Sequence, residues 1–269
     1  MASDPEFRTD LFRGTAPFYD KFRLAYPDVL LADLRMRART TSTGRLLDLA
    51  CGTGQSTFGL ASHFAEVWAV DQEAEAVEFA RAKARRLGVD HVRWIAGRAE
   101  DVEAEGGFEL VAVGNAFHRF QRRVVAESAM RWLVPGGHLA LLWSSSPWDG
   151  SHEWQHAMAD TVQRWTQVAG ATDRIPANLD EHLAAVPHTT VLARAGFTIV
   201  GEFEFTTPRE WTVEALTGFM YATSFLSLQA LGRNVPAFES DLRARLLAVE
   251  PDGVFREDTS FSYTLASRP

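Results

Sequence analysis

Cysteine is almost absent from this chain: Cys51 is the only one among 269 residues. A single thiol excludes a disulfide within the chain, and no zinc-ligand spacing surrounds it. Apolar runs of the roughly 18 residues that a membrane span needs are also absent. We therefore expect a reducing compartment, the cytoplasm, and neither a bound metal nor a membrane partner. Residues 1–7 lack the apolar centre of a signal peptide, and we expect no structural role for them.

Positive charge is scarce as well. Lys and Arg number 27 against 35 Asp and Glu, which gives a formal net charge of −8. Because nucleic-acid phosphates require a basic face, we expect no nucleic-acid partner. The length and the 46% hydrophobic content suit a single domain that buries its own core. Association into a homodimer stays open.

Short apolar runs alternate with segments of helical spacing through the first half of the chain. The predicted strands are 45–50, 66–71, 91–96, 108–114 and 138–143. The predicted helices are 16–39 with a break at Tyr26-Pro27, 56–64, 74–86 and 120–132. Such alternation implies right-handed βαβ crossovers and a parallel sheet with both faces covered.

The pattern changes after Trp143. Two strands of alternating polarity are predicted at 198–206 and 258–266, which makes seven in all. Helices are predicted at 152–168, 176–187, 212–231 and 237–248. The fold class is therefore α/β: a Rossmann-like, mostly parallel seven-stranded sheet with late helical insertions that form a cap. We expect one domain over 1–269, with a core of 40–145, 188–206 and 258–267 and insertions near 146–187 and 208–257.

A glycine-rich turn follows the first predicted strand, in the sequence Asp48-Leu-Ala-Cys-Gly52-Thr-Gly54-Gln. Its two glycines let the backbone turn sharply and approach a ligand closely. Asp71 ends the second strand, 19 residues beyond Gly52, where an acidic side chain can accept both hydroxyls of a ribose. A dinucleotide is the rival ligand, but Thr57 occupies the third glycine position of its fingerprint. An NAD-dependent oxidoreductase is therefore disfavoured.

Four segments in order resemble the motifs of the class I S-adenosylmethionine-dependent methyltransferases. Leu46–Gly54 resembles their first motif and Val67–Asp71 their second. Gly97–Asp101 resembles the segment that binds adenine, and Leu133–Gly137 the turn before their fifth strand. The stretch Tyr19–Pro27 is similar to a helix that often covers the cofactor in members acting on small molecules.

This resemblance implies S-adenosylmethionine as the cofactor and assigns residues to its parts. The turn would flank the methionine part, Asp71 would hold the ribose, and Ala99 and Glu100 would meet the adenine. Arg98 departs from the family, where many members carry an acidic residue. The implied cofactor-binding residues are Tyr19, Asp48, Ala50, Gly52, Gly54, Asp71, Gln72, Ala99, Glu100 and Asn115.

The fourth strand runs into Gly114-Asn-Ala-Phe-His118-Arg119-Phe, a segment that faces the substrate in the family. His118 is the predicted catalytic residue, because a near-neutral imidazole can take a proton from an attacking hydroxyl or amine. The alternative is a histidine that only packs at the strand end. Arg119 stands where relatives often have tryptophan, and it can pair with a substrate carboxylate or with a surface carboxylate.

Aromatic side chains gather in the two insertions, where they are interpreted either as walls of a substrate pocket or as core. They are Trp148, Trp154, Trp165, Trp211, Phe219, Tyr221 and Phe225. The predicted function is methyl transfer from S-adenosylmethionine to an oxygen or nitrogen of a small molecule. Transfer to carbon, and a non-catalytic protein that binds S-adenosylmethionine, stay open. The sequence does not identify the acceptor.

Overall fold

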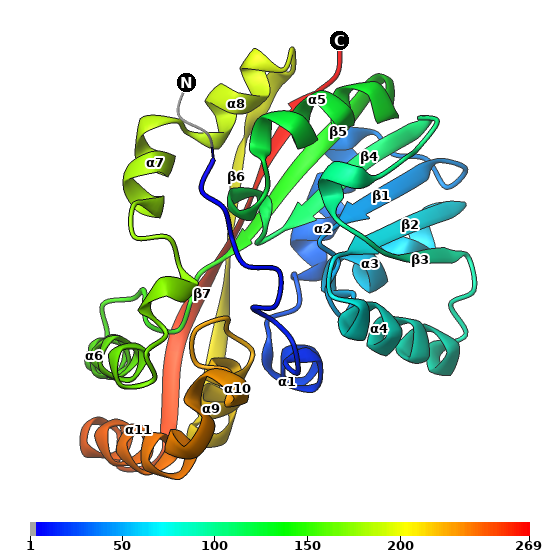
Figure 1. The fold of residues 1–269 in the computed structure, drawn as a ribbon. Helices are drawn as coiled ribbons and strands as arrows, with labels where there is room; N and C mark the ends of the chain where they lie inside the picture. The colour runs from blue at the N-terminus through cyan, green and yellow to red at the C-terminus, as the bar shows by residue number, and fades with distance from the viewer. Residues whose placement is uncertain (1–3) are drawn as a thin grey trace.

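The computed structural model describes residues 4–269 and contains a seven-stranded sheet of order β3-β2-β1-β4-β5-β7-β6 (Figure 1). The strands are β1 Arg45–Leu49, β2 Glu66–Asp71, β3 Val92–Ala96, β4 Phe108–Gly114, β5 Leu133–Ser144, β6 Thr198–Thr212 and β7 Val254–Ser267. β1 to β5 are mutually parallel, whereas β7 is antiparallel to both β5 and β6. The prediction of a Rossmann-like, mostly parallel seven-stranded sheet is confirmed.

Helices cover both faces of the sheet (Figure 1). They are α1 Ala16–Phe22, α2 Asp28–Ala38, α3 Gln55–Leu60, α4 Ala74–Leu87, α5 Arg122–Trp132, α6 Glu153–Val168, α7 Leu179–Ala185, α8 His188–Arg194, α9 Val213–Tyr221, α10 Leu228–Leu231 and α11 Val235–Val249. Side chains of one strand alternate between two cores. Leu46 packs in the core of α2, and its neighbour Leu47 packs in the core of α5. Within residues 4–269 no helix is long and apolar enough to cross a bilayer.

The chain from β5 onward differs from the prediction in three places. β6 and β7 are longer than predicted, because they pair with each other along nearly their whole length. The predicted turn at 135–137 lies inside β5. The helix predicted over 212–231 is interrupted between α9 and α10. There Thr223 Oγ1 accepts a hydrogen bond from Leu226 N, and Ser227 caps α10 through Ala230 N. These hydroxyls compete with helical hydrogen bonding.

Residues 4–15, which we call the N-terminal strap, cross the sheet between the cap and the strand ends (Figure 1). Asp4 forms an ion pair with Arg122, whose side chain is 1% exposed, at 2.7 Å. Farther along the strap, Arg174 Nη2 donates to the carbonyl of Leu11, and Gly14 N donates to Glu75. The expectation of no structural role for residues 1–7 is therefore wrong for residues 4–7, because these long-range contacts leave no periodicity in the sequence. Residues 1–3 lie outside the described part.

Candidate functional site

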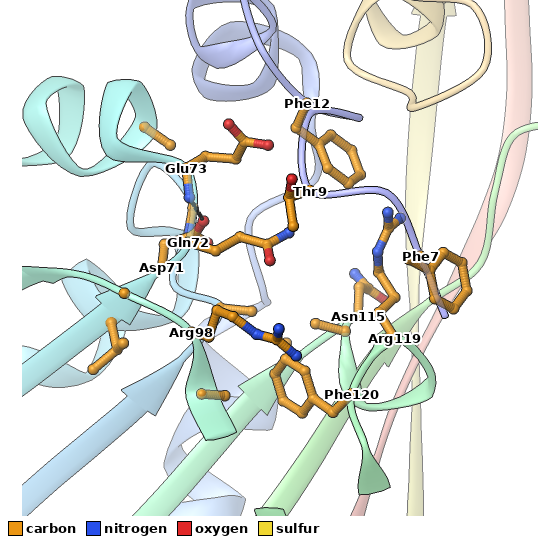
Figure 2. Close-up of a pocket in the computed structure, with 18 of the residues that line it drawn as sticks. Phe7, Thr9, Phe12, Asp71, Gln72, Glu73, Arg98, Asn115, Arg119 and Phe120 are labelled. Carbon is orange, nitrogen blue, oxygen red and sulfur yellow. Dashed lines mark hydrogen bonds between the residues drawn. The ribbon is translucent and has the colours of Figure 1, made fainter. Parts of the chain in front are cut away.

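A cavity of about 320 Å³ opens at the carboxyl ends of β1, β2 and β4, beneath the N-terminal strap (Figure 2). Open α/β sheets bind their ligands at this edge. Most residues that the sequence assigned to the cofactor lie in its wall, namely Tyr19, Ala50, Gly52, Asp71, Gln72, Ala99, Glu100 and Asn115. The two that do not are Asp48, which is fully buried beneath the turn, and Gly54, which is the N-cap residue of α3.

The turn after β1 has the backbone of a ligand-binding loop. Ala50, Gly52 and Gly54 have φ angles of 55°, 54° and 93°, a region that disfavours side chains with a Cβ. A Cβ on Gly54 would lie 2.6 Å from the ring of Phe58. Ala50 adopts this conformation despite its methyl group. Backbone strain of this kind is concentrated at ligand sites.

Asp71 fixes this turn from the end of β2. Gly52 N and Glu73 N each donate to one of its carboxylate oxygens at 2.8 Å. Burial raises the pKa of Asp71, while these two backbone N–H groups act in the opposite direction. A carboxylate has about four acceptor positions. Asp71 therefore keeps capacity for hydroxyl donors of a ligand in the cavity.

Asp48 holds the turn from below. Its Oδ2 accepts from Ser56 Oγ and Thr57 Oγ1. Its Oδ1 is buried and has no hydrogen-bond partner within residues 4–269. Burial raises the pKa of Asp48 to about 6, although the two hydroxyls lower it. Buried polar atoms almost always have a partner, so this orphaned oxygen fits a site whose ligand brings a cationic donor.

The far end of the cavity carries the segment assigned to adenine. Glu100 accepts from the backbone N of Gln121 at 2.9 Å and from Arg98 Nε at 3.4 Å. Arg98 stands where many family members have an acidic residue. It places a guanidinium in the wall, and this guanidinium is already paired with Glu100. Ala99, buried between these two residues, offers its backbone to a ligand.

A narrow recess continues the site behind Asn115, which has a φ of 50°. Asn115 is held by two hydrogen bonds of 3.0 Å to Ser144, one to its hydroxyl and one from its backbone N. Arg23 and Tyr26 also line this recess. Arg23 Nε is buried without a partner in the described residues, and burial lowers the pKa of Arg23. The sequence did not single out Arg23, although it lies inside the Tyr19–Pro27 motif.

His118 lies outside the cavity wall. Its ring contacts Phe7 and Trp143, with centroids 6.0 and 5.9 Å away. Burial lowers its pKa to about 3, and Arg119 acts in the same direction. Arg119 takes the place in the wall instead (Figure 2). His118 thus supports the wall, and its assignment as a general base stays a prediction.

The strap supplies wall residues that the sequence gave no reason to select. Phe7, Thr9 and Phe12 line the cavity opposite the strand ends (Figure 2). A phenylalanine in an irregular segment gives no periodic signal, and only the anchored strap brings these rings to the site. No group of three or more histidine, cysteine, aspartate or glutamate side chains within residues 4–269 is arranged to hold a metal ion.

Comparison with known proteins places this geometry in a family. A methyltransferase domain model matches residues 46–137. An uncharacterized methyltransferase of Schizosaccharomyces pombe is 27% identical, over 84% of this chain and 80% of the relative. The chain is therefore a methyltransferase with a class I fold. The methyltransferase also shares its fold with the YcgJ protein of Bacillus subtilis, at a TM-score of 0.55 and 16% identity over 90% of this chain and 99% of that one.

The methyltransferase is similar in fold to a geranyl diphosphate methyltransferase as well. That structure contains geranyl diphosphate and sinefungin, an analogue of S-adenosylmethionine. The TM-score is 0.51 at 15% identity, over 90% of this chain and 77% of the other. At such identity the likeness establishes the fold only, so cofactor and acceptor must be argued from this chain's own residues.

The cap aromatics of the methyltransferase belong to the core. Trp154, Trp165 and Trp211 are buried at 2%, 6% and 0% exposure, and each indole N–H donates to an oxygen of the protein. Every residue that lines the main cavity lies between Pro5 and Gln121. The late insertions therefore do not line this cavity, because the strap covers the strand ends instead. Their part in a substrate pocket stays a prediction.

Proposed function

We propose that this methyltransferase binds S-adenosylmethionine in the main cavity and transfers its methyl group to an oxygen or nitrogen of a small molecule. The observation that carries the proposal is the pairing of Asp71 with the strained turn at Gly52, at the carboxyl edge of the sheet. A ribose held by Asp71 would place the adenine beside Ala99 and the methionine part toward Asn115. A cavity of about 320 Å³ that is covered by a strap favours a small acceptor over a polymer.

The methionine part carries an ammonium and a carboxylate, and the chain offers an opposite charge for each. The Oδ1 of Asp48, which has no partner among residues 4–269, lies beneath the turn and suits the ammonium through a water. The guanidinium of Arg23, in the recess with Tyr26, suits the carboxylate, because its Nε has no partner among residues 4–269. These two buried charges would then stabilise the bound cofactor rather than remain uncompensated.

Bound cofactor supplies an electrophilic methyl group on a sulfonium. The chain's contribution is to align the acceptor with that group and to exclude water, which can provide much of the rate. Phe7, Phe12 and Phe120 make the cavity wall apolar around the few polar groups. The strap covers the site from the side opposite the strand ends.

Isothermal titration of the protein with S-adenosylmethionine and with NAD tests the proposal. Micromolar binding of S-adenosylmethionine, on the order of −8 kcal/mol, is expected, with no binding of NAD. Adenosylhomocysteine should then accumulate when a mixture of small acceptors is added. Absence of S-adenosylmethionine binding would contradict the proposal, and binding of NAD instead would indicate an oxidoreductase.

Cofactor affinity should depend on the charge of Asp48. Its pKa of about 6 in the free protein means that the carboxylate is mostly protonated at pH 5 and mostly ionised at pH 7. Binding of a cation favours the ionised form, so affinity should rise about tenfold between these pH values and level off above pH 7. Titrations in Asp48→Asn should be weaker and flat over this range. An equal rise in Asp48→Asn would assign the effect to another group, such as Asp71, whose pKa burial also raises.

Replacing His118 by Gln should have little effect on the methyl-transfer step. A ring outside the cavity wall with a pKa of about 3 is a weak base at neutral pH. We expect kcat within about tenfold of the wild type for any acceptor that the protein methylates, measured as adenosylhomocysteine release. General bases typically contribute 10²- to 10⁴-fold. A loss of that size with unchanged cofactor affinity would establish His118 as the base.

A further inference from the structure

Arg119 is a cation in the cavity wall that has no carboxylate partner among the described residues. Its guanidinium lies 4.6 Å from the ring centroids of both Phe7 and Phe12. Its Nη2 is buried and has no hydrogen-bond partner in the described residues, and no carboxylate of residues 4–269 pairs with it within 4.0 Å. Burial lowers its pKa to about 10, so the side chain is charged at neutral pH.

Two other arginines near the cavity already have carboxylate partners. Arg98 pairs with Glu100, and the buried Arg122 pairs with Asp4. Figure 2 shows Arg119 on the side of the cavity away from Asp71 and Glu73, whose charges raise its pKa only from a distance. A guanidinium that loses water without gaining an anion is costly, and two phenylalanine faces offset only part of that cost.

The missing partner has the chemistry of a carboxylate, which a guanidinium binds through two parallel hydrogen bonds. The cofactor's own carboxylate is one source. The recess behind Asn115 already contains a second guanidinium, that of Arg23, on the side assigned to the methionine part. It donates to the carbonyl of Ala222, but its Nε has no partner among residues 4–269. Two guanidinium groups in adjoining cavities, neither with a carboxylate partner among residues 4–269, therefore correspond to two ligand carboxylates.

We propose that Arg119 binds a carboxylate of the methyl acceptor, so that the substrate of this methyltransferase is a small organic acid. This inference rests on the proposed function. Phe7 and Phe12 hold the guanidinium between their rings. The strap that covers the cavity therefore also positions the group that binds the acceptor. The same charge disfavours an acceptor that carries an ammonium near this position.

Arg119→Gln and a matched control, Arg123→Gln on the exposed face of α5, test the assignment. Arg123 pairs with Glu127 and its side chain is 68% exposed. Protein saturated with adenosylhomocysteine is titrated with a panel of small carboxylic acids, including benzoate and succinate, and with the corresponding neutral amides. The wild type and the control should bind at least one acid in preference to its amide. Arg119→Gln should bind that acid roughly 10- to 100-fold more weakly, with adenosylhomocysteine affinity within twofold of the wild type.

A second ligand separates the two sources of carboxylate. 5′-Methylthioadenosine lacks the amino-acid part of adenosylhomocysteine. If Arg119→Gln weakens adenosylhomocysteine but not methylthioadenosine, Arg119 binds the cofactor's carboxylate and the proposal is wrong. The proposal is also wrong if Arg119→Gln retains wild-type affinity for the acid. It is wrong as well if no acid binds the wild type saturated with adenosylhomocysteine at up to about 10 mM, which corresponds to a binding free energy near −3 kcal/mol. Failure of the proposed function has a different signature, since the wild type would then not bind adenosylhomocysteine.

Discussion

Asp71→Asn is expected to weaken S-adenosylmethionine binding by roughly 100-fold. The substitution keeps the size of the side chain but removes its charge, and it puts an amide N–H₂ against either Gly52 N or Glu73 N, both of which donate to the carboxylate. Hydrogen bonds to a charged group contribute about 1.5–3 kcal/mol each. Loss of the charge-assisted bonds to a ribose, together with loosening of the turn, produces the expected effect. Calorimetric titration measures it directly.

Asp90→Asn is the matched control, because the Asp90 side chain is fully exposed at the end of the loop before β3. It should bind S-adenosylmethionine as the wild type does. Thermal unfolding of Asp71→Asn without ligand shows whether the turn, rather than the binding contact, has failed. A cofactor affinity within threefold of the wild type would remove Asp71 from the site.

Trp211→Ala is expected to destabilise the protein by about 3–5 kcal/mol. The indole is fully buried, its Nε1 donates to Glu257 Oε1 at 2.7 Å, and its ring meets that of Phe219 at 5.6 Å. Alanine leaves a large cavity beneath α9 and removes a hydrogen bond from a carboxylate that is only 9% exposed. Urea unfolding followed by far-UV circular dichroism measures the change.

Trp211→Phe separates packing from hydrogen bonding. It keeps an aromatic ring, and Glu257 retains its donors Gln155 and Thr259, so the cost should fall to about 1–2 kcal/mol. Cofactor affinity of folded protein should be unchanged in both variants, because Trp211 lies outside the cavity wall. A loss of less than 1 kcal/mol in Trp211→Ala would contradict the assignment of this residue to the core.

The first half of the fold was predictable because its signals are local. Parallel strands buried on both faces are short continuous apolar runs, and β2 and β4 were predicted at the residues where they occur. The late strands were harder, since their length is set by pairing. β6 and β7 extend each other to Thr212 and Val254, and neither strand alone carries a signal for that extent.

The candidate site also has a part that the sequence predicts and a part that it does not. The turn at Gly52 and the acidic residue at Asp71 follow from spacing and from the family resemblance, because local backbone geometry determines both. The position of the strap does not follow from the sequence, because the contact that fixes it, between Asp4 and Arg122, joins residues 118 positions apart. The cap aromatics show a further limit. Helical spacing places Trp165 on one face of α6, but only tertiary packing decides whether that face meets a cavity or a core.

The ion pair that anchors the strap has a consequence for kinetics. We expect a molecule held beneath residues 4–15 to leave only when the strap moves. Release of the strap separates Asp4 from Arg122, whose side chain is 1% exposed. Such lid movements limit turnover in many enzymes. Residence time of the product is therefore tied to a contact with no atom at the reacting centre. If methyl transfer is faster than movement of the strap, a faster chemical step leaves the turnover number unchanged. A weaker ion pair between Asp4 and Arg122 would then raise the turnover number.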